Sequence, residues 1–137
     1  ELRDLARGIA PPVLSDRGLA AAVEALGTRA PVLVTVDARI SRRPAPVVES
    51  AAYFVVAESL TNVAKHAPGA SAAVSLRLAG DTLDVTVADD GPGGAEVATG
   101  GGLDGLRRRV AALDGAFEVS SPAGGGTRID VRLPCGS

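Results

Sequence analysis

Four polar side chains recur along one predicted helix at a spacing that gathers them on one side. They are Glu58, Asn62, Lys65 and His66, placed by winding the helix at about 100° per residue. The opposite side carries Ala52, Val56, Leu60 and Val63. Lys65 is the only lysine of the chain and His66 its only histidine. The pattern fits a functional face, and it also fits a solvated face whose cations favour the helix C-terminus.

Asp89 stands where the alternation of its predicted strand expects an apolar side chain. The other members of that strand face are Leu83, Val85 and Val87. A carboxylate buried there needs a hydrogen-bond donor, and a ligand amino group such as the exocyclic amine of adenine would supply one. Gly91 and Gly93 follow at once, and glycine lets a backbone approach a ligand closely. The alternative is that Asp89 caps the turn, with Asp90 as a further turn residue.

Two more glycine-rich segments precede predicted elements. Gly100, Gly101, Gly102 and Gly105 lead into a helix, and freed N–H groups at a helix start suit phosphates. A dinucleotide fingerprint would directly follow a strand, and a Walker A loop would need Gly-Lys-Ser/Thr, which the chain lacks. Thr127 follows Gly126 and shares the inward face of the last strand, although a structural threonine is the ordinary explanation.

The helices and strands that must position these residues are predicted from the spacing of apolar residues and from the Gly and Pro residues that end each element. We expect helices over residues 2–9, from 16 or 18 to 26, from 44 or 46 to 66 and over 103–113. We expect strands over 31–38, 74–78, 83–87, 117–121 and 127–133, with hairpin turns at 80–81 and 121–126. Helices and strands that are grouped rather than strictly alternating predict an α+β sandwich, with helices on one face of the sheet.

Length and composition limit the class of protein. The 137 residues suit one domain, and the net charge of −2 lacks the basic footprint of a nucleic-acid binder. The single cysteine, Cys135, favours a reducing compartment, and no apolar run is long enough for a membrane helix. The chain opens at Glu1 inside a helical pattern, so we expect an excised domain, and with the single cysteine we expect it in the cytoplasm.

The order of these segments resembles the N, G1, G2 and G3 boxes of the GHKL ATP-binding superfamily. The matching residues are Glu58-x-x-x-Asn62-x-x-Lys65-His66, Asp89-x-Gly91-x-Gly93, Gly100-x-Gly102-Leu103-x-Gly105 and Gly126-Thr127. Three features are similar to the NarL/DesK-like class of sensor histidine kinases with a HisKA_3-type dimerisation domain. They are the short loop between the second and third boxes, the helix of residues 102–110 and the final segment of residues 126–134. The resemblance implies a two-layer α/β sandwich of the Bergerat type, with a mixed, mostly antiparallel sheet.

The resemblance also implies roles, position by position. Asn62 would coordinate Mg²⁺, and Asp89 would receive the adenine amino group. Lys65 and His66 would approach the phosphates, and Glu58 would act as a general base or orient Asn62. The remaining expected ATP-binding residues shape the adenine pocket, end the ATP lid or support the Asp89 carboxylate directly or through water; they are Gly91, Gly93, Gly100, Gly102, Leu103, Gly105 and Thr127.

The phosphoacceptor histidine of such kinases lies on a dimerisation helix upstream of Glu1, since His66 belongs to the nucleotide box. Residues 1–28 resemble the end of that dimerisation region and its linker, and residues 29–137 the ATP-binding domain. The implied partners are ATP, the dimerisation domain of the same kinase and a response regulator, with no nucleic acid. We expect this chain to be a monomer that cannot autophosphorylate, and the full-length kinase to be a homodimer.

Three alternatives remain open at this point. An anti-sigma-factor serine kinase of the same superfamily lacks a dimerisation helix, which the pattern of residues 2–26 argues against. An ATPase of the MutL or Hsp90 type would continue into a transducer domain, for which no residues remain. From a different class, the chain would be a nucleotide-dependent interaction module without catalysis, and transfer of phosphate to an added acceptor segment separates it from a kinase.

Overall fold

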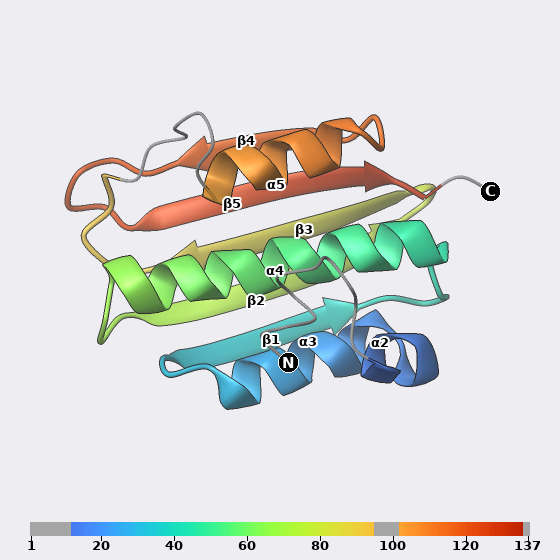
Figure 1. The fold of residues 1–137 in the computed structure, drawn as a ribbon, viewed down its shortest axis with the longest axis horizontal. Coiled ribbons are helices and arrows are strands. Elements are labelled where there is room, and N and C mark those ends of the chain that lie inside the picture. Colours follow the sequence, from blue (N-terminus) through green and yellow to red (C-terminus); the bar gives the residue numbers. More distant parts are fainter. Residues whose placement is uncertain (1–11, 95–101, 136–137) are drawn as a thin grey trace.

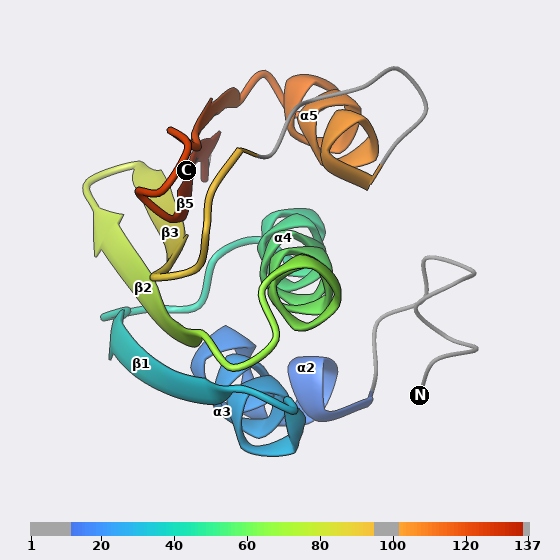
Figure 2. The same cartoon turned by 90° about the vertical axis from the view of Figure 1, so that its left-hand side faces the viewer.

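A computed structural model describes residues 12–94 and 102–135 as one five-stranded sheet with helices on one face (Figure 1 and Figure 2). The strands are β1 (Leu33–Arg39), β2 (Ser71–Ala79), β3 (Thr82–Asp89), β4 (Ala116–Ser120) and β5 (Thr127–Pro134). The helices are α2 (Pro12–Arg17), α3 (Leu19–Arg29), α4 (Pro46–His66) and α5 (Gly102–Ala111). Within these residues no helix is long and apolar enough to cross a membrane.

The sheet has the order β1-β2-β3-β5-β4. Strands β1 and β2 are parallel, so a crossover must join them, and α4 provides it. The other three pairings are antiparallel. The predicted α+β sandwich with a mixed, mostly antiparallel sheet is therefore confirmed.

Helix α4 lies over the sheet between α3 and α5 (Figure 2). It begins at Pro46, where the missing N–H of proline costs nothing because the first helical turn has no intrahelical acceptor for it. All but one of the residues from Val48 to Ala57 are buried, and after Val47 the next exposed residue is Thr61 in the second half. The helix was predicted over its observed length, but after the exposed Val47 its first half is buried nearly all round rather than amphipathic.

The N-terminal helices differ from the prediction in two respects. Helix α3 continues through Gly27, the expected stop, to Arg29. A Cβ at Gly27 would lie only 3.2 Å from Cγ1 of Val34. Gly27 thus serves close packing of α3 on β1 rather than termination. Helix α2 was not predicted. It begins at Pro12, and proline is tolerated in the first turn of a helix. The helix expected over residues 2–9 lies outside the described residues.

Arg43 joins the α2–α3 junction to the start of α4. Its guanidinium donates to the carbonyl oxygen of Leu14 at 3.0 Å and to both carboxylate oxygens of Glu49, at 2.7 and 3.2 Å. The Glu49 side chain is buried, and its carboxylate raises the pKa of Arg43. Arg43, in the loop before α4, thereby fixes α2 to this end of α4.

Candidate functional site

The second half of α4 carries the four polar residues singled out from the sequence. Glu58 and Asn62 are half-buried, whereas Lys65 and His66 in the last turn are exposed. All four precede Ala67, the residue that ends the helix. The structure therefore presents a carboxylate, an amide and two basic groups along the open side of one helix end.

The loop after β3 packs directly against that helix end. A Cβ added to Gly91 would lie 2.5 Å from the Cβ of Ala67 and 3.0 Å from Oδ1 of Asp89. Any residue larger than glycine would push the loop away from α4, since such separations are shorter than van der Waals contact. Gly91 thus holds the end of β3, with Asp89, beside the end of α4.

Asp89 is the last residue of β3 and lies on its inward face, where it is half-buried. Its Oδ1 atom accepts a hydrogen bond from the N–H of Gly91 at 2.8 Å, which is the turn-capping geometry. Among the described residues, the other oxygen, Oδ2, has no hydrogen-bond partner. The two interpretations of Asp89 are thus compatible, because capping the turn occupies one oxygen and leaves one for a ligand.

Thr127 lies directly opposite Asp89 in the pairing of β3 with β5. Its hydroxyl is 2.6 Å from the hydroxyl of Ser121, and the structure records no direct hydrogen bond between Thr127 and the Asp89 carboxylate. Ser121 was not singled out from the sequence, because its contact depends on how the β4–β5 loop folds back.

Glycines let the loop after β3 and the loop between β4 and β5 interlock. Gly93 has a φ of +70°, and a Cβ there would lie 2.1 Å from the carbonyl oxygen of Pro122. Gly126 has a φ of +77°, and a Cβ there would lie 2.2 Å from the carbonyl oxygen of Asp89. The N–H of Gly94 donates to the carbonyl oxygen of Ser121 at 2.8 Å. These contacts build one wall beside Asp89.

The first turn of helix α5 lies beside α4. Gly102 begins the helix, Leu103 is buried, and Gly105 has open space where a Cβ would be. Gly100 lies outside the described residues. A cavity of about 240 Å³ separates the two helices and is lined by Phe54, Ala57, Glu58, Thr61, Gly105, Leu106 and Arg109. Glu58 and Gly105, from two of the sequence motifs, therefore share one cavity.

The sequence model of the family of histidine kinase-, DNA gyrase B- and HSP90-like ATPases matches residues 47–137. The chain belongs to this family. The match begins at the start of α4 and takes in every site residue described above. ATP binding is the property that this domain implies.

Relatives place the chain among the ATP-binding domains of sensor histidine kinases. The sensor histidine kinase MctS of Rhizobium johnstonii is 31% identical over 145 residues, covering 98% of this chain and 31% of MctS. YxjM of Bacillus subtilis is 32% identical over 89 residues, covering 65% of this chain and 22% of YxjM. The chain thus spans about a fifth to a third of these curated relatives.

Solved histidine kinase structures share the fold of this ATP-binding domain. The histidine kinase domain of the blue-light activated kinase EL346 of Erythrobacter litoralis superposes with a TM-score of 0.62 at 31% identity, covering 85% of this chain and 57% of that one. The mycobacterial sensor histidine kinase MprB has a TM-score of 0.59 at 22% identity, covering 85% of this chain and 91% of that one, and supports the fold alone.

Three consecutive arginines follow the second glycine-rich motif of the ATP-binding domain, and the structure separates them. Arg107 and Arg108 form ion pairs with Asp104, whose side chain is buried. Arg109 instead lies over the ring of Phe54, 4.6 Å from its centroid, and lines the cavity that holds Glu58. The sequence showed the arginine run but not which member faces α4, because that depends on how α4 and α5 pack.

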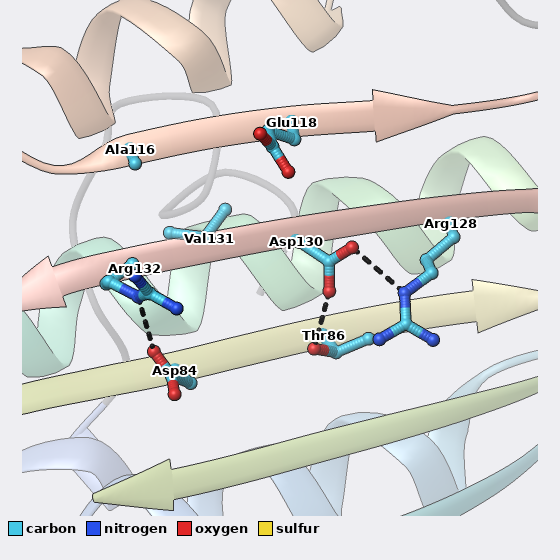
Figure 3. Close-up of a pocket in the computed structure, with 8 residues that line it drawn as sticks. All are labelled: Asp84, Thr86, Ala116, Glu118, Arg128, Asp130, Val131 and Arg132. Atoms are coloured by element: carbon cyan, nitrogen blue, oxygen red, sulfur yellow. Dashed lines mark hydrogen bonds and ion pairs between the residues drawn. The ribbon is translucent and has the colours of Figure 1, made fainter. Parts of the chain in front are cut away.

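The helix-free face of the ATP-binding domain carries a separate hollow of about 520 Å³ (Figure 3). Arg132 pairs with Asp84, and Asp130 accepts from both Arg128 and Thr86. Partial burial raises the pKa of Asp130, but the hydrogen bonds from Arg128 and Thr86 outweigh it and lower the pKa overall. The paired charges of this face lie on the side of the sheet opposite α4.

The side chains of α4 are the ones to consider as ligands for Mg²⁺. Among residues 12–94 and 102–135, no three His, Cys, Asp or Glu side chains gather as a metal site. A single amide oxygen, from the half-buried Asn62, stands one turn after Glu58. One hard oxygen ligand fits an ion that retains waters and also binds phosphate oxygens.

Proposed function

We propose that this chain is the catalytic ATP-binding domain of a sensor histidine kinase of the NarL/DesK-like class, and that it transfers the γ-phosphoryl group of Mg-ATP to a histidine of the dimerisation domain. A response regulator then receives the group. The observation that carries the proposal is the contact of the Gly91 loop with Ala67, which brings the Asp89 carboxylate beside the polar end of α4. Positioning and charge neutralisation account for most of the catalysis of phosphoryl transfer, and these groups supply both.

Asp89 recognises the adenine in this proposal. The Gly91 N–H holds Oδ1, so Oδ2 is the oxygen that accepts from the exocyclic amine. Gly91 and Gly93 keep the neighbouring wall free of side chains, and Thr127 supports the carboxylate from the opposite strand. A guanine base presents a carbonyl oxygen where adenine has its amine, so the same carboxylate disfavours GTP.

The phosphates extend from there along the end of α4. Lys65 and His66 are exposed in the last turn and approach phosphate oxygens. Asn62 holds Mg²⁺ through its amide oxygen, and the ion supplies neutralisation of phosphate charge. The start of α5, with Gly102, Leu103 and Gly105, supplies backbone N–H groups to the phosphates, and Gly100 is assigned to the same ATP-binding segment.

Glu58 lies beside the path of transfer. It is one helical turn before Asn62 and opens on the cavity that Arg109 also lines. We assign it either proton removal as a general base or the orientation of Asn62. Arg109, held on the Phe54 ring, places a positive charge on the opposite wall of that cavity.

The remaining assignments concern the rest of the kinase. Residues 1–28 are the end of the dimerisation region and its linker, and residues 29–137 form the ATP-binding domain. This chain is a monomer and the whole kinase a homodimer. Both act in the cytoplasm, where ATP and response regulators are found. The contact of Arg43 with Leu14 supports a linker that is fixed to the domain it precedes.

A calorimetric titration of the chain with Mg-ATP and Mg-GTP tests the nucleotide assignment. We expect saturable binding of ATP, weaker binding of GTP, and at least a tenfold loss of ATP affinity in Asp89→Asn, because the carboxylate bond to the amine is charge-assisted. Asp37→Asn, on an exposed pair of β1, is the matched control and retains full affinity. Equal affinity for both nucleotides in the wild-type chain would contradict the adenine assignment.

Radiolabelled ATP tests the kinase assignment. With a separately supplied dimerisation segment that carries the acceptor histidine, we expect acid-labile label on that segment and none on the chain itself. Glu58→Gln distinguishes the two roles of Glu58. If Glu58 is a general base, the variant retains its ATP affinity but no longer transfers the phosphoryl group. If Glu58 orients Asn62, the variant also binds Mg-ATP more weakly. ATP binding without label on the acceptor would favour the non-catalytic interaction module.

A further inference from the structure

The hydroxyl of Ser59 is buried without a hydrogen-bond partner among the residues that the structure describes. Its side chain is 1% exposed. Leaving a buried hydroxyl unpaired is costly, so such a group calls for an explanation. The neighbouring Thr61 shows the usual solution, since its hydroxyl donates to the carbonyl oxygen of Ala57 one turn earlier at 2.9 Å. Ser59 makes no such bond to its own helix.

The place of Ser59 on α4 points it toward the candidate site. At about 100° per residue, its direction lies between that of Asn62, which is half-buried, and that of Val63, which is buried. Ser59 precedes these residues by three and four positions, and residues so spaced share one helix face. Its hydroxyl therefore lies on the side of α4 that runs from the polar residues to the sheet.

The level of Ser59 along β3 follows from the contact between Ala67 and Gly91. Helix α4 and strand β3 run in the same direction and meet at those two residues (Figure 1). Ser59 is about 12 Å before Ala67 at the helical rise, and Val87 is about 13 Å before Gly91 at the strand rise. By the same arithmetic Asp89 is level with Val63. Ser59 thus lies about one helical turn deeper than the Asp89 carboxylate.

We propose that Ser59 is a specificity-determining residue whose hydroxyl donates a hydrogen bond to a ring nitrogen of the purine base. The assignment rests on the proposed function, in which Asp89 holds the exocyclic amine at the outer edge of the base. The inner edge of a base inserted between α4 and β3 then reaches the level of Ser59. A ring nitrogen accepts from a hydroxyl, so the buried group gains the partner that the protein does not provide.

Ser59→Ala is the variant that tests this assignment. The nucleotide-free protein loses no hydrogen bond, so we expect its urea midpoint to be unchanged or higher. The ATP affinity falls about two- to tenfold, the usual contribution of one neutral hydrogen bond. Ser75→Ala, which removes a hydroxyl from β2 on the helix-free face, is the matched control and leaves the affinity unchanged.

Titration of both proteins with 1-deaza-, 3-deaza- and 7-deaza-ATP identifies the accepting nitrogen. The wild-type chain loses affinity for one analogue, and Ser59→Ala binds that analogue as weakly as the wild-type chain does. A variant that binds ATP as tightly as the wild-type chain, or one whose loss is the same for every analogue, contradicts the role of Ser59. Failure of the wild-type chain to bind ATP contradicts the proposed function itself and, with it, this assignment.

Discussion

Asp89 shows how one side chain meets a structural and a functional demand together. Its Oδ1 atom caps the turn through the Gly91 N–H, and its Oδ2 atom has no partner among the described residues. The cap fixes the torsion of the carboxylate before any ligand arrives, so the entropy of orienting it is not lost on binding. A rigid acceptor also discriminates better between an amine and a carbonyl than a mobile one, because it cannot turn away from the wrong base.

At the residue scale, two glycines of the β4–β5 loop allow the cost of a strained backbone to be compared with the cost of a steric clash. Gly126 and Gly124 both have positive φ, +77° and +78°. A Cβ at Gly126 would strike the carbonyl oxygen of Asp89, whereas one at Gly124 would meet nothing within 4 Å. We expect Gly124→Ala to cost about 1 kcal/mol of unfolding free energy. Gly126→Ala should cost about 2–3 kcal/mol and also lower ATP affinity, because Asp89 must move.

Urea unfolding and calorimetric titration of the two glycine variants provide the comparison. Equal loss of stability in both would mean that the loops relax around a methyl group at residue 126. Unchanged ATP affinity in Gly126→Ala would then also show that the position of Asp89 tolerates such a shift.

At the element scale, the spacing of apolar residues was enough to predict β2, β3, β5 and α4, because each has a long regular pattern with a turn or proline at its ends. Gly27 misled the prediction of α3, since a glycine needed for close packing against Val34 looks the same in sequence as a helix stop. The candidate residues on α4 and β3 were visible as polar breaks in apolar patterns. Ser121 and Arg109 were not, because their contacts arise only when separate elements pack.

The pairing of β3 with β5 also predicts a pH dependence. Arg128 and Thr86 hold the pKa of Asp130 below its ordinary value, so the folded chain keeps this carboxylate ionised to lower pH than the unfolded chain does. The ionised Asp130 carboxylate therefore contributes its full stabilisation of the folded chain above the pKa that Asp130 has in the unfolded chain. This stabilisation is lost as the pH falls through the pKa that Asp130 has in the folded chain. The Asp130 side chain is 39% exposed, so solvent screening limits the contribution to about 0.5 kcal/mol.

Asp130→Asn should accordingly lower the unfolding free energy at about pH 7. The deficit should shrink as the pH falls through the folded pKa of Asp130, because the protonated carboxyl is uncharged like the amide. Asp37→Asn, which breaks an exposed pair on β1, is the control and should change little over the same pH range. Urea unfolding across this range is the measurement. A deficit in Asp130→Asn that persists at the acidic end would assign its effect to packing rather than to charge.

At the scale of the whole molecule, the candidate site belongs to no single element. Asp89 comes from β3, Thr127 from β5, Asn62 from α4 and Gly105 from α5. The Arg43 contacts with Leu14 and Glu49 extend this set to α2, at the opposite end of α4 from the site. A ligand that contacts four elements of one cooperative fold stabilises all of them, because unfolding of any one removes its site.

Mg-ATP should therefore raise the thermal midpoint of the chain. At a hundred times the dissociation constant, binding to the folded state alone adds about 2.7 kcal/mol, which corresponds to roughly 8 °C for a domain of this size. Asp89→Asn and Mg-GTP should each give a much smaller shift at the same concentrations. Differential scanning calorimetry makes the comparison directly. An equal shift with GTP, or in Asp89→Asn, would mean that the phosphates alone bind and that β3 does not recognise the base.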